Sequence, residues 1–416
     1  MIKLSNFSKA IRDPIWNHIR LSPELYEITK SEPFLRLYKI KQLGPTELVY
    51  PGASHTRAAH SIGVYNAALK MLTHFAEKGS LQWVTKHGIM SFLTAALLHD
   101  LGHFPFTHSL KELNLKEHEI LTGELILKEP LLSLCAKAGA LPEQTAAIIT
   151  KKKNCGTETV FFQKLLSGVL DPDKIDYLNR DAFYCGVPYG IQDTDFIFSQ
   201  LLPDKKNGIK LNSKAIISVE SVLFSKYLMY KAVYWHKDVR IATAMMKKAV
   251  FLGLEQKQFS NEALYSQDDL SLFNLIEKCN YEEKNIALDL KEGRLYKIIC
   301  EIPFDGKNKR HVLLENLVKR TETEKKLAEF ISVKSKTVIE PPEIIIDIPE
   351  RISFESDLFI EDEQKNFTQS STVFSENFIK TLVPSLRKIR IAAAQKKYQK
   401  ISKLKKYQLA DFLNIG

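Results

Sequence analysis

The chain has few cysteines and no long apolar segment, and each absence excludes a class of protein. Its five cysteines among 416 residues are widely spaced and never form a CxxC pair, so neither a disulfide framework nor a thiolate zinc site is indicated. The apolar runs are far shorter than the roughly 20 residues that span a bilayer. The first residues, MIKLSNFSKAIRD, lack the apolar core of a secretory signal. We expect a cytoplasmic protein with no membrane partner.

Acidic residues are absent from one stretch near the C-terminus. Between Lys380 and Lys406 there are ten Lys or Arg and no Asp or Glu, which accounts for the whole net charge of +10. Residues 340–363 carry nine acidic residues and a single base. Such blocks are typical of solvated faces, or of a basic helix that packs on an acidic segment. Nucleic-acid binding through Lys380 to Lys406 is a weaker alternative, because few aromatic residues accompany the run.

Histidine, in contrast, is concentrated in one region. Eight of the eleven histidines lie between residues 55 and 118, and HDLGHFPFTH (99–108) contains three of them beside Asp100. Imidazole and carboxylate together suit a divalent metal, which lowers the pKa of water and neutralises phosphate charge. Residues 88–103 are apolar on most faces and predict a buried helix on which His99 and His103 face the same cleft. The cluster indicates a metal-assisted hydrolase.

Apolar periodicity predicts helices over most of the chain. The predicted helices cover Arg57 to about Lys78, 88–103, 109–127, 173–185, Val222 to Leu252, most of 253–333, and the basic C-terminal segment. A hairpin is predicted within residues 207–221, with Asn207-Gly208 as one candidate turn among its polar residues, and a strand is predicted around Ile344 to Ile346. We expect three parts: a core over 1–252, a helical extension over 253–333, and an accessory region over 334–416 with the acidic stretch and the basic helix.

Six blocks of the sequence resemble HD-domain phosphohydrolases of the dNTP triphosphohydrolase type. They are RLYKIKQLG (36–44), YPGASHTRAAHSIGV (50–64), ALLHDLGHFPFTH (96–108), EHE (117–119), DPDKIDYLNRD (171–181) and VYWHK (233–237). The resemblance implies a mainly α HD-domain fold with a short β-hairpin and a small mixed C-terminal region. It also makes residues 1–252 the catalytic core of a metal-dependent hydrolase.

By this resemblance, the metal ligands are His60, His99, Asp100 and Asp173. Two imidazoles and two carboxylates leave open positions on an octahedral ion, whereas a structural zinc site would be closed. We therefore expect iron, manganese, cobalt or magnesium, with zinc or nickel as ions that could occupy the site after purification. Taken singly, His60 could be a core histidine and Asp173 a helix cap. Four matches in order favour the metal site.

The resemblance also implies how a nucleotide is handled. Water activated at the metal would attack the α-phosphate, giving a nucleoside and inorganic triphosphate. His118 would protonate the leaving 5′ oxygen, as an imidazole of near-neutral pKa can, and His103 would assist it. The groups expected to hold phosphate are Arg57, His108, Lys174 and Tyr177. Those expected around the sugar and base are Gln42 and Asp181 at the 3′-hydroxyl, Leu43 near the base, and Tyr234 against C2′.

Two positions depart from the family pattern. Lys226 and Tyr230 stand where the mammalian member has an arginine and a histidine, so one phosphate contact becomes a point charge and another a hydroxyl. A different nucleotide or phosphate ester therefore stays open as the substrate. We expect a homo-oligomer, because family members usually assemble and the two charged C-terminal segments could pair between subunits. A nucleic-acid-binding protein with a vestigial HD site is the remaining alternative, and its binding would weaken steeply with salt.

The sequence predicts no activation by a guanine nucleotide. In the mammalian member an aspartate, a glutamine and an arginine read the guanine of an activating nucleotide, and the matching residues here are Lys30, Leu35 and Tyr38. None of the three offers the same hydrogen-bond pattern. Adding GTP to the purified protein should change the rate on another dNTP by less than the roughly fivefold that allosteric coupling typically produces. A large increase in that rate would overturn this prediction.

Overall fold

Two largely buried helices form the centre of the N-terminal part. The computed structural model describes residues 7–402, 404 and 406–414. Helix α3 (Arg57–Glu77) begins at Thr56, whose side chain accepts a hydrogen bond from the Ala59 N–H, and α4 (Lys86–Leu98) begins in the same way at Thr85. These caps satisfy donors that the first helical turn leaves free. The α3 prediction is confirmed, and α4 ends earlier than predicted.

Helix α9 (Pro172–Cys185) packs directly on α3. It begins with Pro172 after the capping side chain of Asp171, and it ends at Gly186, which has a φ of 66°. Proline at the first position and a left-handed glycine after the last one are typical helix boundaries. The remaining helices of this part are α1 (Pro23–Ile28), α2 (Glu32–Leu37), α5 (His118–Ile126), α6 (Leu131–Lys137), α7 (Pro142–Thr150), α8 (Thr157–Leu166) and α10 (Thr194–Gln200).

The long helix predicted from Val222 to Leu252 is interrupted. The chain forms α11 (Ile216–Met229), a π-helical turn (Tyr230–Tyr234) and α12 (Lys237–Glu255). The His236 side chain accepts a hydrogen bond from the Asp238 N–H and caps the new helix, which explains the restart. The helix predicted over 109–127 is also too long, because α5 begins only at His118.

The predicted hairpin lies slightly upstream of its expected place. Strands β3 (Leu201–Asp204) and β4 (Gly208–Leu211) pair antiparallel, and Gly208 has a φ of 85°. The turn lies at residues 205–207 and Gly208 begins β4, so the turn is slightly upstream of the predicted Asn207-Gly208, and residues 216–221 are helical. A second hairpin, β1 (Lys9–Asp13) with β2 (Asn17–Leu21), lies near the N-terminus. Short strands β7 (Phe359–Ile360) and β8 (Lys365–Asn366) extend the sheet in the order β3-β4-β7-β8.

The prediction of a basic C-terminal helix is wrong. Residues 380–402 form the end of α18 (Glu376–Leu386), strand β9 (Lys388–Ala393) and α19 (Gln395–Ile401), while Lys403 and Lys405 lie outside the described residues. Strand β9 is central, antiparallel to both β5 (Lys297–Pro303) and β6 (Ile344–Asp347). All of its residues after Lys388 are buried, as is typical of a central strand that is covered on both faces.

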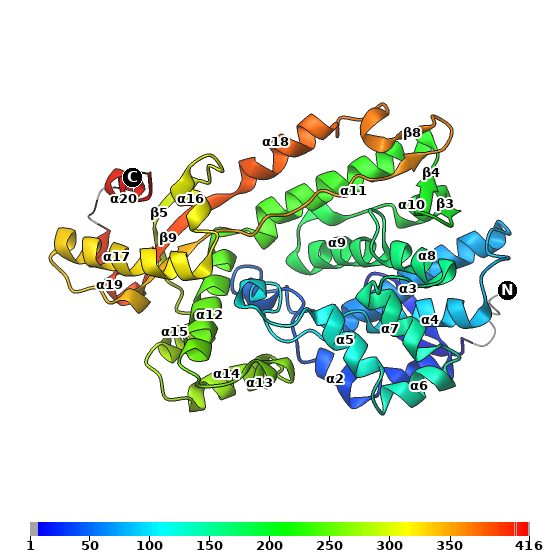
Figure 1. Cartoon of the computed structure of the whole chain (residues 1–416), viewed down its shortest axis with the longest axis horizontal. Helices are drawn as coiled ribbons and strands as arrows, with labels where there is room; N and C mark the ends of the chain where they lie inside the picture. Colours follow the sequence, from blue (N-terminus) through cyan, green and yellow to red (C-terminus); the bar gives the residue numbers. More distant parts are fainter. Residues whose placement is uncertain (1–6, 403, 405, 415–416) are drawn as a thin grey trace.

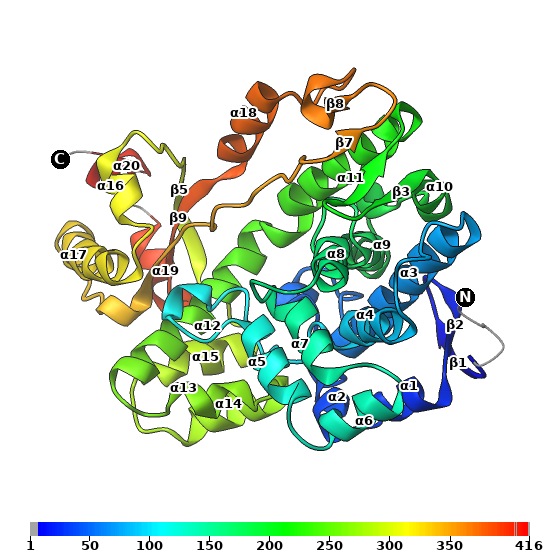
Figure 2. The ribbon, with the colours of Figure 1, turned by 45° about the vertical axis from the view of Figure 1, so that its right-hand side comes forward.

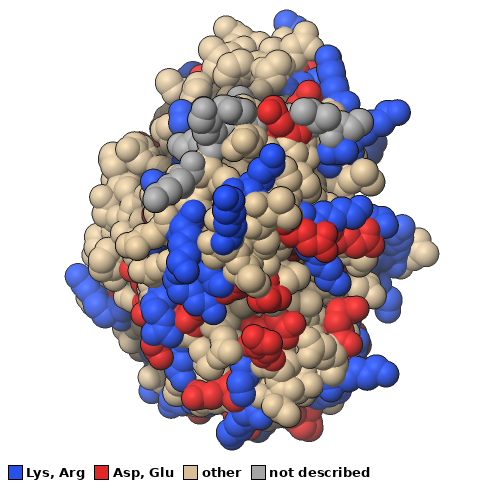
Figure 3. Space-filling view, turned by 90° about the vertical axis from the view of Figure 1, so that its left-hand side faces the viewer, with Lys and Arg blue, Asp and Glu red and all other residues tan. Residues whose placement is uncertain are grey.

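Acidic neighbours pair much of the basic segment within the chain. Lys388 and Arg390 both bond to Glu301, at 2.7 and 2.8 Å, and Arg387 lies 2.8 Å from Glu315. Figure 3 shows basic and acidic side chains interspersed on the face at this end of the molecule. The charge-based argument for pairing between subunits is thereby weakened, and the homo-oligomer stays a prediction.

The β6 prediction is confirmed, whereas β5 interrupts the predicted helical extension. That extension otherwise forms the helices α13 (Asn261–Tyr265), α14 (Asp269–Lys278), α15 (Lys284–Lys291), α16 (Lys309–Leu313) and α17 (Leu317–Ser335). The described C-terminal residues end in α20 (Lys406–Asn414). No described helix has the length and apolarity needed to cross a membrane. The fold is mainly α with small β regions, as predicted (Figure 1).

Three hydrophobic clusters organise these elements. The first includes α3, α4, α9 and α11, the second surrounds α12, α14 and α15, and the third joins α17 to the sheet of β5, β9 and β6. Late residues such as Phe354, Phe367 and Phe374 belong to the first cluster. Figure 2 shows this late segment returning along α11. The division at residues 252 and 333 stays a prediction.

Gly63 tests the close contact between α3 and α9. A Cβ atom at Gly63 would lie 1.9 Å from Asp176 Oδ1 and 2.3 Å from Arg180 Nη2, so Gly63→Ala would displace a buried ion pair. We expect the free energy of unfolding to fall by about 3 kcal/mol, measured as a lower urea midpoint. Gly156→Ala is the control, because nothing lies within 4 Å of its added Cβ. Equal midpoints for the two variants would contradict the prediction.

Candidate active site

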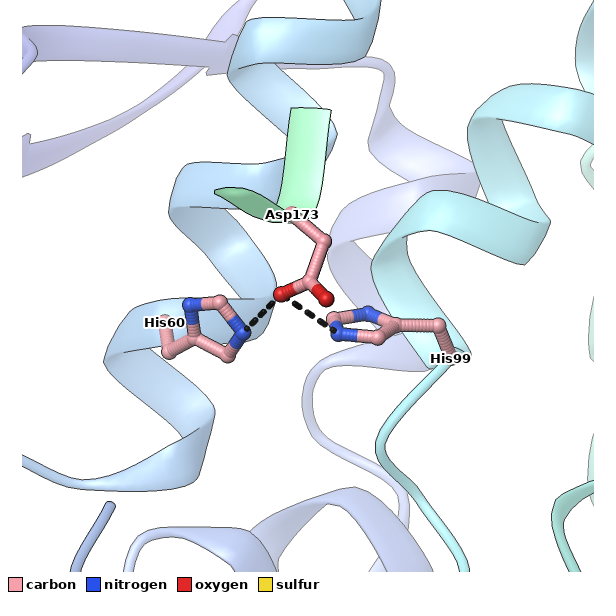
Figure 4. Close-up of side chains that lie close together, drawn as sticks. All are labelled: His60, His99 and Asp173. Carbon is pink, nitrogen blue, oxygen red and sulfur yellow. Dashed lines mark ion pairs between the residues drawn. The ribbon is translucent and has the colours of Figure 1, made fainter. Parts of the chain in front are cut away.

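Three of the predicted metal ligands meet at the junction of α3, α4 and α9. Ligand atoms of His60, His99 and Asp173 all lie within 4.8 Å of one another. Figure 4 shows both imidazoles pointing at the Asp173 carboxylate, whose Oδ1 lies 3.0 Å from His60 Nε2 and 3.8 Å from His99 Nε2. Residues that are 113 positions apart in the sequence thus converge on one point.

Hydrogen bonds on the far side of each ring orient the two histidines. Nδ1 of His60 lies 2.9 Å from Asp176 Oδ2, and Nδ1 of His99 lies 2.9 Å from the Ala96 carbonyl oxygen. Each imidazole therefore presents Nε2 inward, the arrangement that outer hydrogen bonds impose on metal-binding histidines. His99 Nε2 is buried and makes no hydrogen bond among the described residues. These residues fit a divalent metal ion.

Asp100 lies beside His60 and His99 and contacts two further side chains, Arg57 and His103. Its oxygens are 3.4 Å from His99 Nε2 and 3.9 Å from His60 Nε2, but 2.6 Å from Arg57 Nη1 and 3.0 Å from His103 Nε2. Burial opposes ionisation, yet His103, His99 and Arg57 hold the pKa of Asp100 well below its usual value. The carboxylate is thus ionised and shared between the candidate metal site and Arg57.

Carboxylates also control the protonation of His60. Burial lowers the pKa of an imidazole, but Asp173 and Asp176 outweigh that effect and raise the pKa of His60 to about 10. An incoming cation would therefore compete with a proton at His60.

The HD pair lies in a turn, which corrects the predicted helix over 88–103. Helix α4 ends at Leu98, and His99 caps it. Thr122 on α5 stabilises the turn, since its hydroxyl accepts from the Gly102 N–H at 2.8 Å and donates to the His99 carbonyl at 3.2 Å. A Cβ at Gly102 would lie 2.2 Å from the His118 carbonyl oxygen. The glycine thus allows α5 to approach, and the turn replaces the helical spacing expected for His99 and His103.

Three further histidines cluster next to Asp100, and two of them are stacked. The rings of His103 and His118 lie 3.8 Å apart at 16°, and His108 is 4.8 Å from His103. Burial, helped by nearby positive charge, lowers the pKa values of His108 and His118 to about 3. The near-neutral pKa expected for His118 is therefore not found, and the imidazole is neutral at physiological pH.

Every predicted site residue lines one cavity of about 650 Å³. These residues are His60, His99, Asp100, Asp173, Arg57, His103, His118, Gln42, Leu43, His108, Lys174, Tyr177, Asp181, Lys226, Tyr230 and Tyr234. Burial raises the pKa of the three tyrosines, so they remain hydroxyl donors. Burial and the nearby Lys174 lower the pKa of Lys226 to about 8. The cavity has a volume typical of small-molecule sites.

The Asp181 end of the cavity contains a residue that the sequence analysis missed. Asp181 accepts a hydrogen bond from Tyr234 Oη at 2.6 Å, and its other oxygen lies 2.8 Å from His55 Nε2. His55 is buried and stacks on Tyr184 at 4.6 Å. The side-chain oxygen of Gln42 is also buried and lacks a partner among the described residues. The histidine concentration included His55, but no spacing rule linked it to Asp181.

A second missed part of the site comes from the C-terminal half. Residues 350–353 and Glu355 line the same cavity, as does Arg240 on α12. The acidic character of this stretch is visible in the sequence, but its position over the cavity depends on the tertiary fold.

Sequence comparisons agree with this arrangement of histidines and aspartates. A model of the HD domain matches residues 57–152, which contain three of the four candidate metal ligands, and a model of the HD associated region matches residues 199–393. The chain thus contains an HD domain followed by an HD associated region. This HD-domain chain therefore carries its HD motif, His99-Asp100, in the turn after α4.

Relatives of this HD-domain chain occur in archaea, bacteria and eukaryotes. An uncharacterized protein of Methanocaldococcus jannaschii is 35% identical over 70% of this chain and 59% of its own length. An uncharacterized protein of Bacillus subtilis is 32% identical, with coverages of 69% and 65%. The deoxynucleoside triphosphate triphosphohydrolase SAMHD1 homolog of Dictyostelium discoideum is 27% identical, with coverages of 71% and 60%. The match thus spans less than two thirds of each relative.

Solved structures resemble the fold over nearly the whole chain. A hypothetical protein from Aquifex aeolicus has a TM-score of 0.73 at 24% identity, covering 95% of this chain and 98% of that one. A phosphohydrolase from Bacteroides thetaiotaomicron has a TM-score of 0.71 at 23% identity, with coverages of 93% and 100%.

Asp173→Asn tests the candidate metal site directly. Because the Asp173 carboxylate faces both imidazoles, we expect its loss to weaken Mn²⁺ binding by at least about a hundredfold, the upper range for outer hydrogen-bond partners of metal ligands. Isothermal titration and elemental analysis would measure this. Asp195→Asn is the matched control, because its side chain is 83% exposed and pairs with Lys70. Stoichiometric, tight Mn²⁺ in the Asp173 variant would refute the assignment.

Proposed function

We propose that this protein is a metal-dependent phosphohydrolase that converts deoxynucleoside triphosphates to deoxynucleosides and inorganic triphosphate. The observation that carries the proposal is a single cavity in which a His/Asp cluster lies beside lysines, an arginine and tyrosine hydroxyls. Relatives named as deoxynucleoside triphosphate triphosphohydrolases support the choice of substrate.

The proposed roles divide the cavity into a reacting end and a sugar end. A divalent ion held by His60, His99, Asp100 and Asp173 would supply an activated water and offset phosphate charge. At the same end, Arg57 is already held by Asp100 at 2.6 Å. Because Asp100 already holds the Arg57 side chain, Arg57 would lose little further mobility when substrate binds. Its remaining N–H groups would bind phosphate oxygens.

His118 is proposed to donate a proton to the leaving 5′ oxygen, assisted by His103. Its pKa of about 3 makes it neutral at rest, but a triphosphate would bring several negative charges into the cavity and favour the imidazolium form. Glu119 Oε2 lies 3.1 Å from His118 Nδ1 and would stabilise the same charge. Protonation of His118 would therefore be coupled to substrate binding.

At the other end, Tyr234 and Asp181 are proposed to read the sugar. The 2.6 Å hydrogen bond between them fixes the phenol ring, which would contact C2′ and exclude a ribose 2′-hydroxyl. Asp181 and Gln42 would bind the 3′-hydroxyl, and Leu43 would contact the base. His108, Lys174, Tyr177, Lys226 and Tyr230 are proposed to contact the phosphate chain.

A phosphohydrolase acting on another nucleotide is the second candidate. Lys226 and Tyr230 favour it, because an ammonium and a phenol bind a phosphate chain less selectively than an arginine and a histidine. Product identity separates the two candidates: triphosphate release supports the first, and orthophosphate or pyrophosphate supports the second.

One assay tests the function. Purified protein with several divalent metals and a panel of dNTPs and NTPs should release inorganic triphosphate from dNTPs in preference to NTPs. Asp100→Ala should lower kcat/KM by roughly a thousandfold or more, because metal catalysis contributes several kcal/mol. Asp195→Ala should leave the rate unchanged. Activity that survives Asp100→Ala would show that the metal assignment is wrong.

A further inference from the structure

Residues 348–355 cross the cavity as an extended segment, which we call the strap. The strap connects β6 to β7 and follows α11 in both ribbon views (Figures 1 and 2). Its residues Glu350, Arg351, Ile352, Ser353 and Glu355 line the cavity. One wall of the candidate active site therefore comes from a segment about 180 residues after Asp173.

The backbone of the strap is held at both ends. Arg387 donates two hydrogen bonds to the Pro349 carbonyl oxygen, at 2.8 and 2.9 Å, and Arg240 lies 2.9 Å from Glu350 Oε2. At the other end, Phe354 is buried in the first hydrophobic cluster. The strap is thus a wall of the cavity that is held at both ends.

Two groups of the strap contact two of the lysines that line the cavity. Lys226 Nζ donates to the Ser353 carbonyl oxygen at 2.8 Å, and Lys174 Nζ lies 2.9 Å from Glu355 Oε2. Lys174 also contacts Asp171 Oδ2 at 2.8 Å and donates to the Gly168 carbonyl oxygen at 2.9 Å. These strap oxygens occupy positions on the lysines that phosphate oxygens would take.

Glu355 differs from the other partners of these lysines because it can leave. Its side chain is 46% exposed, whereas that of Asp171 is 2% exposed. The Ser353 carbonyl belongs to the held backbone. A phosphate chain that reaches Lys174 would therefore displace the Glu355 carboxylate into solvent. The carboxylate would return to Lys174 when the phosphate chain departs.

We propose that Glu355 is a specificity-determining residue that sets the affinity of the cavity for a triphosphate chain by competing for Lys174. The inference rests on the proposed function in that Lys174 is taken to bind phosphate. Competition weakens binding of a chain that reaches Lys174, and it favours release of a triphosphate product. Interactions at half-exposed ion pairs are modest, so the competition tunes affinity without blocking the cavity.

Binding of inorganic triphosphate to the full chain tests the proposal. E355Q keeps the shape of the side chain and removes its charge, so we expect triphosphate to bind roughly fivefold tighter at low salt, the upper range for such a pair. The gain should shrink as salt screens the charges. E361Q is the matched control, because Glu361 pairs with Lys210 at 2.8 Å and does not line the cavity. Isothermal titration calorimetry would measure the dissociation constants.

A Lys174→Met background separates competition for Lys174 from a general loss of negative charge. In that background E355Q should give no further increase in the affinity for inorganic triphosphate. Unchanged or weaker triphosphate binding by E355Q overturns the proposal, as does a gain that persists without Lys174 or that E361Q reproduces.

The binding measurement requires no turnover, so the two proposals can fail separately. Tighter binding by E355Q with no hydrolysis of any dNTP would support the competition and refute the proposed function. Hydrolysis of dNTPs with no change in triphosphate binding would refute the competition alone.

Discussion

The buried carboxylate of Asp176 is the interaction on which both the fold and the candidate metal site depend. It pairs with Arg180 at 2.8 Å, accepts from Trp16 Nε1 at 2.6 Å and lies 2.9 Å from His60 Nδ1. Arg180 in turn reaches Asp13 at the end of β1, at 2.8 Å. One ion pair on α9 therefore ties the N-terminal hairpin to α3 and also orients a candidate ligand. A buried charge is tolerated there because each of its oxygens has partners.

The C-terminal half completes the cavity through charge pairing. Arg240 on α12 contacts Asp347 at 2.7 Å and Glu350 at 2.9 Å, and Arg390 on β9 lies 3.6 Å from Asp347. These contacts join the sheet of β5, β9 and β6 to the helix that lines the cavity, and they set the direction in which the strap leaves β6. Some charged residues of the acidic and basic blocks, such as Glu350 and Arg390, thus form ion pairs within the chain that hold the strap over the site.

Local chemistry allowed the best-predicted elements to be recognised. Helices α3 and α9 carry their own start signals, Thr56 and Asp171-Pro172, and α9 also carries its stop signal, Gly186, so neither needs distant partners to be identified. The end of α4 could not be read in this way, because Thr122 on α5 stabilises the turn at Gly102. Strand β9 was mistaken for helix since its basic residues suggested a solvated face, whereas Glu301 and Asp347 on neighbouring strands neutralise Arg390.

The sequence by itself determined that the chain is mainly helical, that it carries an HD motif, and which residues were candidates for the site. Caps and periodicity are local properties and are sufficient to indicate the helices, whereas the full set of candidate site residues came from the resemblance of six sequence blocks to HD-domain phosphohydrolases. Only the tertiary structure decided that those candidates share one cavity, that His55 supports Asp181, and that Glu355 lies on Lys174. These contacts join segments far apart in the chain, and their geometry depends on how buried helices and sheets pack together.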